Sequence, residues 1–173
     1  SLQGESTFAG LPCVFIRLTG CDLRCSYCDT AYAFTGGETL TLDSILEQTT
    51  ALAEGYPEPP LVELTGGEPL LQKETPALLA ALADRGFTVL LETSGAHDIS
   101  GVDARVHRIV DLKCPSSGES ERNLPANLHH LRASDEVKCV IGTREDYDWA
   151  KTQLRQLFGK CEVLFSWVNP LEA

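Results

Sequence analysis

The sequence predicts an α/β fold with a single parallel sheet, and three observations support this prediction. Apolar runs of strand length alternate with segments in which apolar residues recur every three or four positions. Turn-forming residues separate the two kinds of segment. Glycine-rich and polar stretches follow the strands, as expected where loops meet at the carboxyl edge of a parallel sheet. The expected strands cover residues 11–18, 61–65, 87–92, 108–112, 136–141 and 162–165.

Each strand has a local justification, beginning with the first. The run at 11–18 is apolar, and Thr19-Gly20 stops it. The second run, 61–65, follows a proline-rich turn and leads into Gly66-Gly67. The last four runs are short and apolar, and turn-forming residues bound them, so each fits a buried strand.

Helices are expected between the strands. Apolar residues recur at helical spacing over 42–53, where Thr41 is a suitable N-cap and Gly55 ends the segment. A second helix is expected over 74–85. Two more, one weak and one better, are expected over 98–106 and 124–131. The last helix carries an apolar stripe made of Tyr147, Ala150, Leu154, Leu157 and Phe158.

Length and composition indicate one domain. The chain has 173 residues and 43% hydrophobic content, which allows a substantial core. We expect a single domain over 1–173, trimmed at its N-terminus because the chain starts with Ser1 and contains no methionine. The family resemblance given below implies that the C-terminus is trimmed as well. No apolar run reaches the roughly 18 residues of a membrane span, and the first residues lack the pattern of a signal peptide. A cytoplasmic protein without a membrane partner is therefore expected.

The charge balance bears on the partners of this protein. The chain has 14 Lys and Arg residues against 25 Asp and Glu residues, a net charge of -11. Nucleic-acid binding takes most of its affinity from basic side chains that meet phosphates. A nucleic-acid partner is therefore not expected.

Three of the seven cysteines form the most informative motif. Cys21, Cys25 and Cys28 have the spacing C-x3-C-x2-C on a loop directly after the first strand. Three thiolates can ligate three irons of a 4Fe-4S cluster and leave the fourth iron open, whereas a plain electron carrier uses four. A zinc site would need a second ligand pair, and the chain has no second C-x2-C and no H-x3-H. Clustered cysteines also indicate a reducing compartment. The remaining cysteines, at 13, 114, 139 and 161, have the character of small buried thiols.

Three polar features near the strand ends allow two interpretations each. The stretch from Thr65 to Pro69 is a ligand loop or an ordinary glycine turn, in which Glu68 would be solvated. Arg17 either faces inward to bind a carboxylate or points outward between helices. Thr30 is either a turn hydroxyl or an oxygen ligand of magnesium. The four histidines, at 97, 107, 129 and 130, lack ligand spacing and are expected on the surface or in loops.

Longer motifs over nearly the whole chain resemble those of the 7-carboxy-7-deazaguanine synthases, a family of radical S-adenosylmethionine enzymes. The motifs that carry the resemblance lie at 1–7, 10–17, 28–30, 65–69, 92–95, 111–118 and 135–138. The resemblance implies a partial barrel of six strand-helix units around the cluster. It also implies conversion of 6-carboxy-5,6,7,8-tetrahydropterin to 7-carboxy-7-deazaguanine with loss of ammonia, a carbon-nitrogen lyase reaction of queuosine and 7-deazapurine biosynthesis.

The resemblance also assigns the site residues. The open iron of the cluster on Cys21, Cys25 and Cys28 would bind S-adenosylmethionine, and Thr30 would bind Mg²⁺. The residues placed at the pterin are Leu2, Gln3, Gly4, Glu5, Arg17 and Thr65. The residues placed around S-adenosylmethionine are Tyr27, Cys28, Asp29, Gly67, Glu68, Ser94, Lys113, Cys114 and Pro115, with Ser166 and Asn169 as looser matches.

The sequence also leads to expectations about the partners of this protein, and two alternative functions remain open. The resemblance implies a flavodoxin-type reductant and a homodimer, and no catalytic side chain beyond the cluster and cofactor. One alternative is another small radical enzyme, such as an activase that forms a glycyl radical on a protein. The other is a non-enzymatic iron-sulfur or zinc module.

Overall fold

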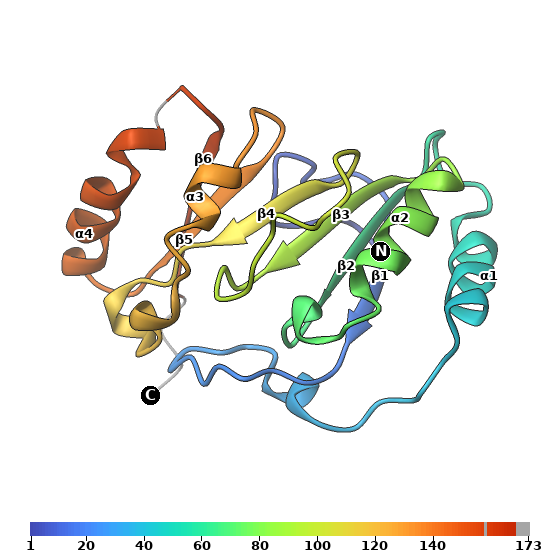
Figure 1. Ribbon diagram of the computed structural model, residues 1–173, viewed down its shortest axis with the longest axis horizontal. Coiled ribbons are helices and arrows are strands. Elements are labelled where there is room, and N and C mark those ends of the chain that lie inside the picture. Colours follow the sequence, from blue (N-terminus) through green and yellow to red (C-terminus); the bar gives the residue numbers. More distant parts are fainter. Residues whose placement is uncertain (158, 169–173) are drawn as a thin grey trace.

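The computed structural model describes residues 1–157 and 159–168 of the chain. One sheet of six parallel strands runs through these residues in the sequential order β1 to β6. The strands are β1 (Cys13–Leu18), β2 (Leu61–Gly66), β3 (Thr88–Thr93), β4 (His107–Asp111), β5 (Glu136–Ile141) and β6 (Glu162–Trp167). The predicted class and strand number are confirmed. The sheet is open between β1 and β6, as in a partial barrel (Figure 1).

Four α-helices lie within the described residues, and two of the helices expected from the sequence are wrong or too long. The helices are α1 (Leu42–Ala53), α2 (Thr75–Asp84), α3 (Asn127–His130) and α4 (Arg144–Leu154). Residues 98–106 form turns, because Asp98 and Asp103 accept hydrogen bonds from nearby backbone N–H groups and so compete with helix formation. Only four residues of the expected helix at 124–131 are helical. Short 3-10 segments lie at Ala31–Phe34, Pro69–Leu71, Pro115–Ser117, Ser120–Arg122 and Arg155–Leu157.

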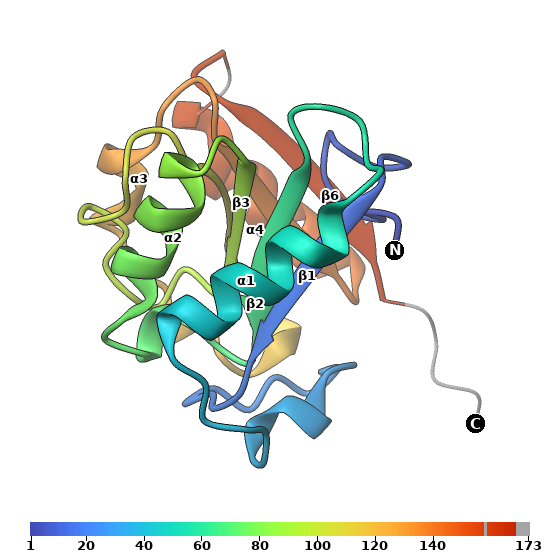
Figure 2. The same ribbon diagram turned by 90° about the vertical axis from the view of Figure 1, so that its right-hand side faces the viewer.

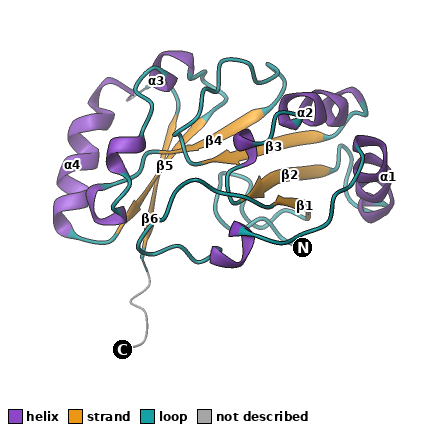
Figure 3. Cartoon of the chain, turned by 60° about the horizontal axis from the view of Figure 1, so that its bottom comes forward, coloured by secondary structure: helices purple, strands orange, loops and turns teal. Residues whose placement is uncertain are grey.

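The outer face of the sheet carries the main hydrophobic core, and the helices cover it (Figures 2 and 3). Val14, Val62 and Leu64 of the first strands pack with the buried leucines of α2. Val137 and Cys139 of β5 pack in the same way against Ala150 and Leu154 of α4. The predicted stripe is confirmed for Ala150, Leu154 and Leu157, which are buried, whereas Tyr147 is exposed and Phe158 lies outside the described residues. A Thr143–Asp146 capping box, which the sequence prediction missed, starts α4.

The inner face of the sheet carries a smaller apolar layer and many charged side chains. Successive residues of a strand point to opposite faces, so Cys13, Phe15 and Arg17 of β1 all face inward. Cys13 and Phe15 contact Leu61, Leu90 and Ile109 in the inner layer. The outward interpretation of Arg17 is therefore wrong, and its exposed side chain lies toward the loops.

The N-terminal segment is held against the inner face at the amino ends of the strands. Leu2 makes an isolated antiparallel bridge to Pro12, so the first strand begins after the proline. The backbone N–H of Thr7 donates to the buried carboxylate of Glu136, which also bonds His107 at 2.8 Å. His107 therefore lies within a strand and is mostly buried, contrary to the expectation of a surface or loop position.

Candidate functional site

The cysteine loop lies beneath the carboxyl ends of the strands, where the loop after β2 fits against it (Figure 1). The backbone N–H of Glu68 donates to the carbonyl oxygen of Gly20 at 2.8 Å. A Cβ atom on Gly67 would lie 2.2 Å from that same oxygen, so this position requires glycine. Gly66 has a φ of +152°, and a Cβ there would lie 2.1 Å from the Leu18 carbonyl oxygen. The glycine pair therefore permits the close approach of the two loops.

The loop after β4 holds the cysteine loop from the other side. Ser26 donates from its backbone N–H to the carbonyl of Ser117 at 2.9 Å, and from its hydroxyl to the carbonyl of Ser116 at 2.7 Å. The backbone N–H of Arg24 donates to the carboxylate of Glu119 at 2.6 Å. The expectation that loops from several strand ends meet in one place is confirmed for these segments.

The three clustered thiols suit an iron-sulfur cluster. Cys21, Cys25 and Cys28 are all partly buried and free of disulfides. Burial raises the pKa of the Cys21 and Cys25 thiols, so they favour the protonated form until a metal replaces the proton. Within residues 1–157 and 159–168, no three ligating side chains gather around a point that would suit a single ion. Thiols spread along a loop fit a cube, in which each cysteine binds a different iron.

Glu68 is a buried clamp between two of these loops. Its side chain is 0% exposed, which rules out the solvated-turn interpretation. Its carboxylate accepts hydrogen bonds from the N–H of Leu70 at 2.8 Å, the hydroxyl of Thr93 at 2.8 Å and the N–H of Ser94 at 2.7 Å. These bonds fix the loop after β2 to the end of β3 and bring Ser94 to the site.

Arg17, Tyr27 and Thr30 lie around the cysteine loop. The guanidinium of Arg17 lies over the ring of Tyr32, 5.8 Å from its centroid, and remains exposed. The hydroxyl of Tyr27 lies 3.4 Å from the carbonyl oxygen of Val140 on β5, and burial raises its pKa. Thr30 makes no side-chain cap; its hydroxyl donates to Asp29 at 2.7 Å. The oxygens of Thr30 and Asp29 therefore lie side by side in a position open to solvent.

The remaining residues expected at the cofactor and the pterin differ in how deeply they are buried. The Lys113 ammonium bonds Asp111 at 2.5 Å, and although burial would lower its pKa, Asp111 raises it overall. The Cys114 side chain is fully buried in the core beneath α4, so only its backbone faces the loops. Leu2, Gly4 and Pro115 are exposed. Ser166 is partly buried on β6, whereas Asn169 lies outside the described residues.

A charged network that the sequence prediction missed lies on the inner face, centred on Lys138 of β5. Its ammonium bonds Glu5 at 2.7 Å, contacts Glu92 at closer range and lies 3.7 Å from Asp111. Burial alone would lower the pKa of Lys138, but the surrounding carboxylates, Asp111 foremost, raise it overall. Glu92 also accepts a hydrogen bond from the Thr65 hydroxyl at 3.2 Å. Lys138 therefore brings two expected pterin residues, Glu5 and Thr65, into one network.

The Gln3 amide is engaged with the protein itself. Its Nε2 donates to the carboxylate of Glu63 at 2.8 Å, and its Oε1 accepts from the N–H groups of Glu5 and Ser6. Gln3 is 4% exposed and Glu63 is 2% exposed. Gln3 therefore fixes the backbone turn that aims Glu5 at Lys138, and only one of its N–H bonds remains for a ligand.

A charge inside an apolar strand was the sequence signal for this network. Glu63 interrupts the run 61–65, and Lys138 interrupts the run 136–141. Neither side chain can be buried without a partner, so each predicts an ionic or hydrogen-bonded group opposite it. The partners themselves come from strands far apart in the sequence and were not predictable from spacing.

The Gln3–Glu63 contact leads to an exchange experiment. We expect Gln3→Glu alone to lower the free energy of unfolding by about 1–3 kcal/mol, because two buried carboxylates would face each other. The double variant Gln3→Glu with Glu63→Gln restores a donor opposite an acceptor and should recover most of that loss. Urea unfolding of the four proteins measures the coupling. Additive losses in the double variant would contradict the contact.

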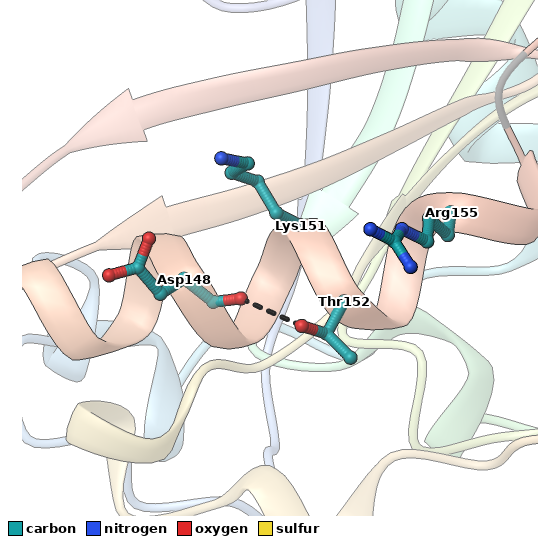
Figure 4. A pocket seen from close by; sticks show the side chains of 4 residues that line it. All are labelled: Asp148, Lys151, Thr152 and Arg155. Carbon is teal, nitrogen blue, oxygen red and sulfur yellow. Dashed lines mark hydrogen bonds between the residues drawn. The ribbon is translucent and has the colours of Figure 1, made fainter.

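A shallow hollow on α4 is separate from this site. Asp148, Lys151, Thr152 and Arg155 line it along one face of the helix, and the Thr152 hydroxyl donates to the Asp148 carbonyl at 3.1 Å (Figure 4). The helix packs on the outer face of the sheet through Ala150, whereas the charged network lies on the inner face.

None of the helices in the described residues is long and apolar enough to span a bilayer.

Comparisons with known proteins identify the family and the fold. The model of the radical SAM superfamily matches residues 15–116. The 7-carboxy-7-deazaguanine synthase of Chlorobaculum tepidum is 47% identical over 171 residues, covering 95% of this chain and 75% of that protein. The protein of the same name from Methanospirillum hungatei JF-1 is 40% identical over 168 residues, covering 96% and 68%. The crystal structure of QueE from Escherichia coli matches with a TM-score of 0.72 and 27% identity, covering 98% of this chain and 81% of that one.

Proposed function

Because this chain belongs to the 7-carboxy-7-deazaguanine synthase family of the radical SAM superfamily, we propose that it converts 6-carboxy-5,6,7,8-tetrahydropterin to 7-carboxy-7-deazaguanine and ammonia. The observation that carries the proposal is the similarity to synthases of that name over nearly the whole chain. The reaction is that of a carbon-nitrogen lyase.

The cysteine loop is where the cofactors would be held. Cys21, Cys25 and Cys28 would bind the 4Fe-4S cluster, with Gly67 and the adjacent loop beside it. When bound, the cluster and S-adenosylmethionine supply one-electron radical chemistry that removes a hydrogen atom from the substrate. The chain contributes loops, bonded to one another by Ser26 and Glu68, that would position the reactants.

The remaining cofactor residues would lie around S-adenosylmethionine at the strand ends. Their support is the position of the loops after β1, β2, β3 and β4, which the bonds described above bring together. The proposed contacts are Tyr27, Cys28, Asp29, Gly67, Glu68, Ser94, Lys113, Cys114 and Pro115, with Ser166 of β6 and Asn169 as looser matches. Cys114 would act through its backbone, because its thiol is in the core.

The pterin would lie over the inner face of the sheet. The exposed Arg17 guanidinium suits the substrate carboxylate, since its planar donors match a carboxylate in bidentate geometry. Glu5 suits the N–H-rich edge of the ring, and Thr65 would lie at the same surface. Leu2, Gln3 and Gly4 would shape this end of the pocket.

Magnesium, the reductant and the assembly are further parts of the proposal. The Thr30 hydroxyl would bind Mg²⁺, which takes few protein ligands and completes its octahedron with substrate and water oxygens. The neighbouring Asp29 carboxylate supports this by adding negative charge. We also expect a flavodoxin-type electron donor, a homodimer and a cytoplasmic location.

The test is turnover by the anaerobically reconstituted chain. We expect 7-carboxy-7-deazaguanine and ammonia from the carboxytetrahydropterin, with a higher rate when Mg²⁺ is added. Electron paramagnetic resonance of the reduced protein should change when S-adenosylmethionine is added, because the open iron gains ligands. An unchanged signal would contradict both radical-enzyme hypotheses, the synthase and the activase. A changed signal without turnover of the pterin would favour the activase.

A further inference from the structure

Residues 2–8 form a strap across the inner face of the sheet, and three buried charged side chains of the strands hold it. Every second residue of the strap from 3 to 7 bonds one of them. The pairs are Gln3 with Glu63 of β2, Glu5 with Lys138 of β5, and Thr7 with Glu136 of β5. Since β2 and β5 are three places apart in the sheet, the strap connects strands that are not neighbours.

The end of the strap at residues 7 and 8 has two anchors. Glu136 is 0% exposed, and its carboxylate accepts from the N–H of Thr7 at 3.2 Å and from the Thr7 hydroxyl at closer range. The ring of Phe8 packs edge-on against His107, with 5.0 Å between the ring centroids, and contacts the inner apolar layer. A buried carboxylate is costly unless it accepts hydrogen bonds. Glu136 therefore favours the state in which the strap is docked on the sheet.

The middle of the strap carries Glu5, and Lys138 holds only part of its carboxylate. The Lys138 ammonium bonds Oε2 of Glu5 at 2.7 Å, and the Glu5 side chain is 56% exposed. Among the described residues, Oε1 of Glu5 has no hydrogen-bond partner. Lys138 itself is 5% exposed. In the docked strap, Glu5 can therefore offer one oxygen to an N–H group of a ligand while Lys138 fixes the direction of the carboxylate.

We propose that Thr7, Phe8 and Glu136 are positioning residues for the pterin, because they dock the strap and the docked strap aims Glu5 at the substrate. This inference rests on the proposed function, which puts Glu5 at the pterin. The three residues act through Glu5 and do not contact the substrate themselves. The anchor contacts and the substrate stabilise the same docked state, so the apparent affinity for the pterin falls in proportion to the fraction of chains with a docked strap.

The test is the double variant Thr7→Val with Phe8→Ala, which removes the hydroxyl donor and the ring that anchor the strap. It changes no residue proposed at the pterin. We expect the KM for the carboxytetrahydropterin to rise about tenfold, with kcat within about twofold of the parent, because saturating substrate restores the docked state. The electron paramagnetic resonance response to S-adenosylmethionine should be unchanged. Thr7→Val alone, at an exposed position that the fold tolerates, should raise KM by a smaller factor.

Amide hydrogen exchange measures the docking of the strap without turnover. The N–H groups of residue 3 and of residues 5–8 are hydrogen-bonded, so we expect the strap to be protected in the cofactor-free parent chain. The double variant should lose this protection, and the pterin should restore it in the reconstituted enzyme. The matched control is Thr152→Val with Tyr147→Ala, a similar pair of changes on α4. It should keep the KM and the strap protection of the parent.

Two results would overturn the inference alone. Protection of the strap in the folded double variant would mean that Thr7 and Phe8 do not hold it. Loss of protection with an unchanged KM would mean that the strap is a structural element with no effect on the substrate. Absence of product from the parent chain would overturn the proposed function, and the positioning role with it, whatever the exchange of the strap.

Discussion

Replacement of Cys25 by alanine is expected to abolish turnover, lowering the rate by more than ~1000-fold. The reaction depends on cofactor chemistry that no side chain of this protein can replace. Two remaining thiolates would hold at most two irons of the cube, so the cluster should not survive purification. Iron and sulfide analysis after anaerobic reconstitution, together with an assay for S-adenosylmethionine cleavage, measures the effect.

The matched control is Cys161→Ala, which removes a thiol of similar burial at the amino end of β6. That cysteine packs against the core beneath α4 and is remote from the loops at the carboxyl ends of the strands. It should retain the iron content and rate of the parent. Full iron content and full activity in Cys25→Ala would mean that the cluster is not bound by this loop.

Strands were predictable from this sequence because each is a short apolar run with a clear stop. The six runs and their order agree with the structure, and the boundaries differ by at most two residues, as at Pro12 before β1. The helix expected over 98–106 failed for a physical reason. Its aspartates bond the backbone locally and form turns, a competition that periodicity cannot reveal.

The site was predictable to the extent that it depends on local motifs. The cysteine spacing and the glycine pair each indicate a function by themselves, and the structure brings their loops together. The role of Glu68 and the network around Lys138 depend on contacts between different strands. Lys138 is 46 residues from Glu92 and 133 residues from Glu5 in sequence, so only the parallel register could place them together.

Glu68→Ala should have the second-largest effect, through both stability and activity. Three donors, from Leu70, Thr93 and Ser94, would lose their acceptor in a site with no exposure. An unsatisfied buried donor costs about 1–3 kcal/mol, so we expect the free energy of unfolding to fall by at least ~3 kcal/mol. The loop after β2 would also lose its attachment to β3, and turnover should fall with it.

The isosteric change Glu68→Gln distinguishes a structural clamp from a residue that only contacts the cofactor. An amide can still accept from Leu70 and Thr93, but its NH₂ group would face the N–H of Ser94, so a loss of about 1–3 kcal/mol is expected. Glu74→Gln makes the same chemical change at an exposed position with no side-chain cap and should leave stability unchanged. Urea unfolding of the cofactor-free chains gives the result. If Glu68→Gln were as stable as the parent and only S-adenosylmethionine binding weakened, the carboxylate would act as a ligand and not as the clamp between β2 and β3.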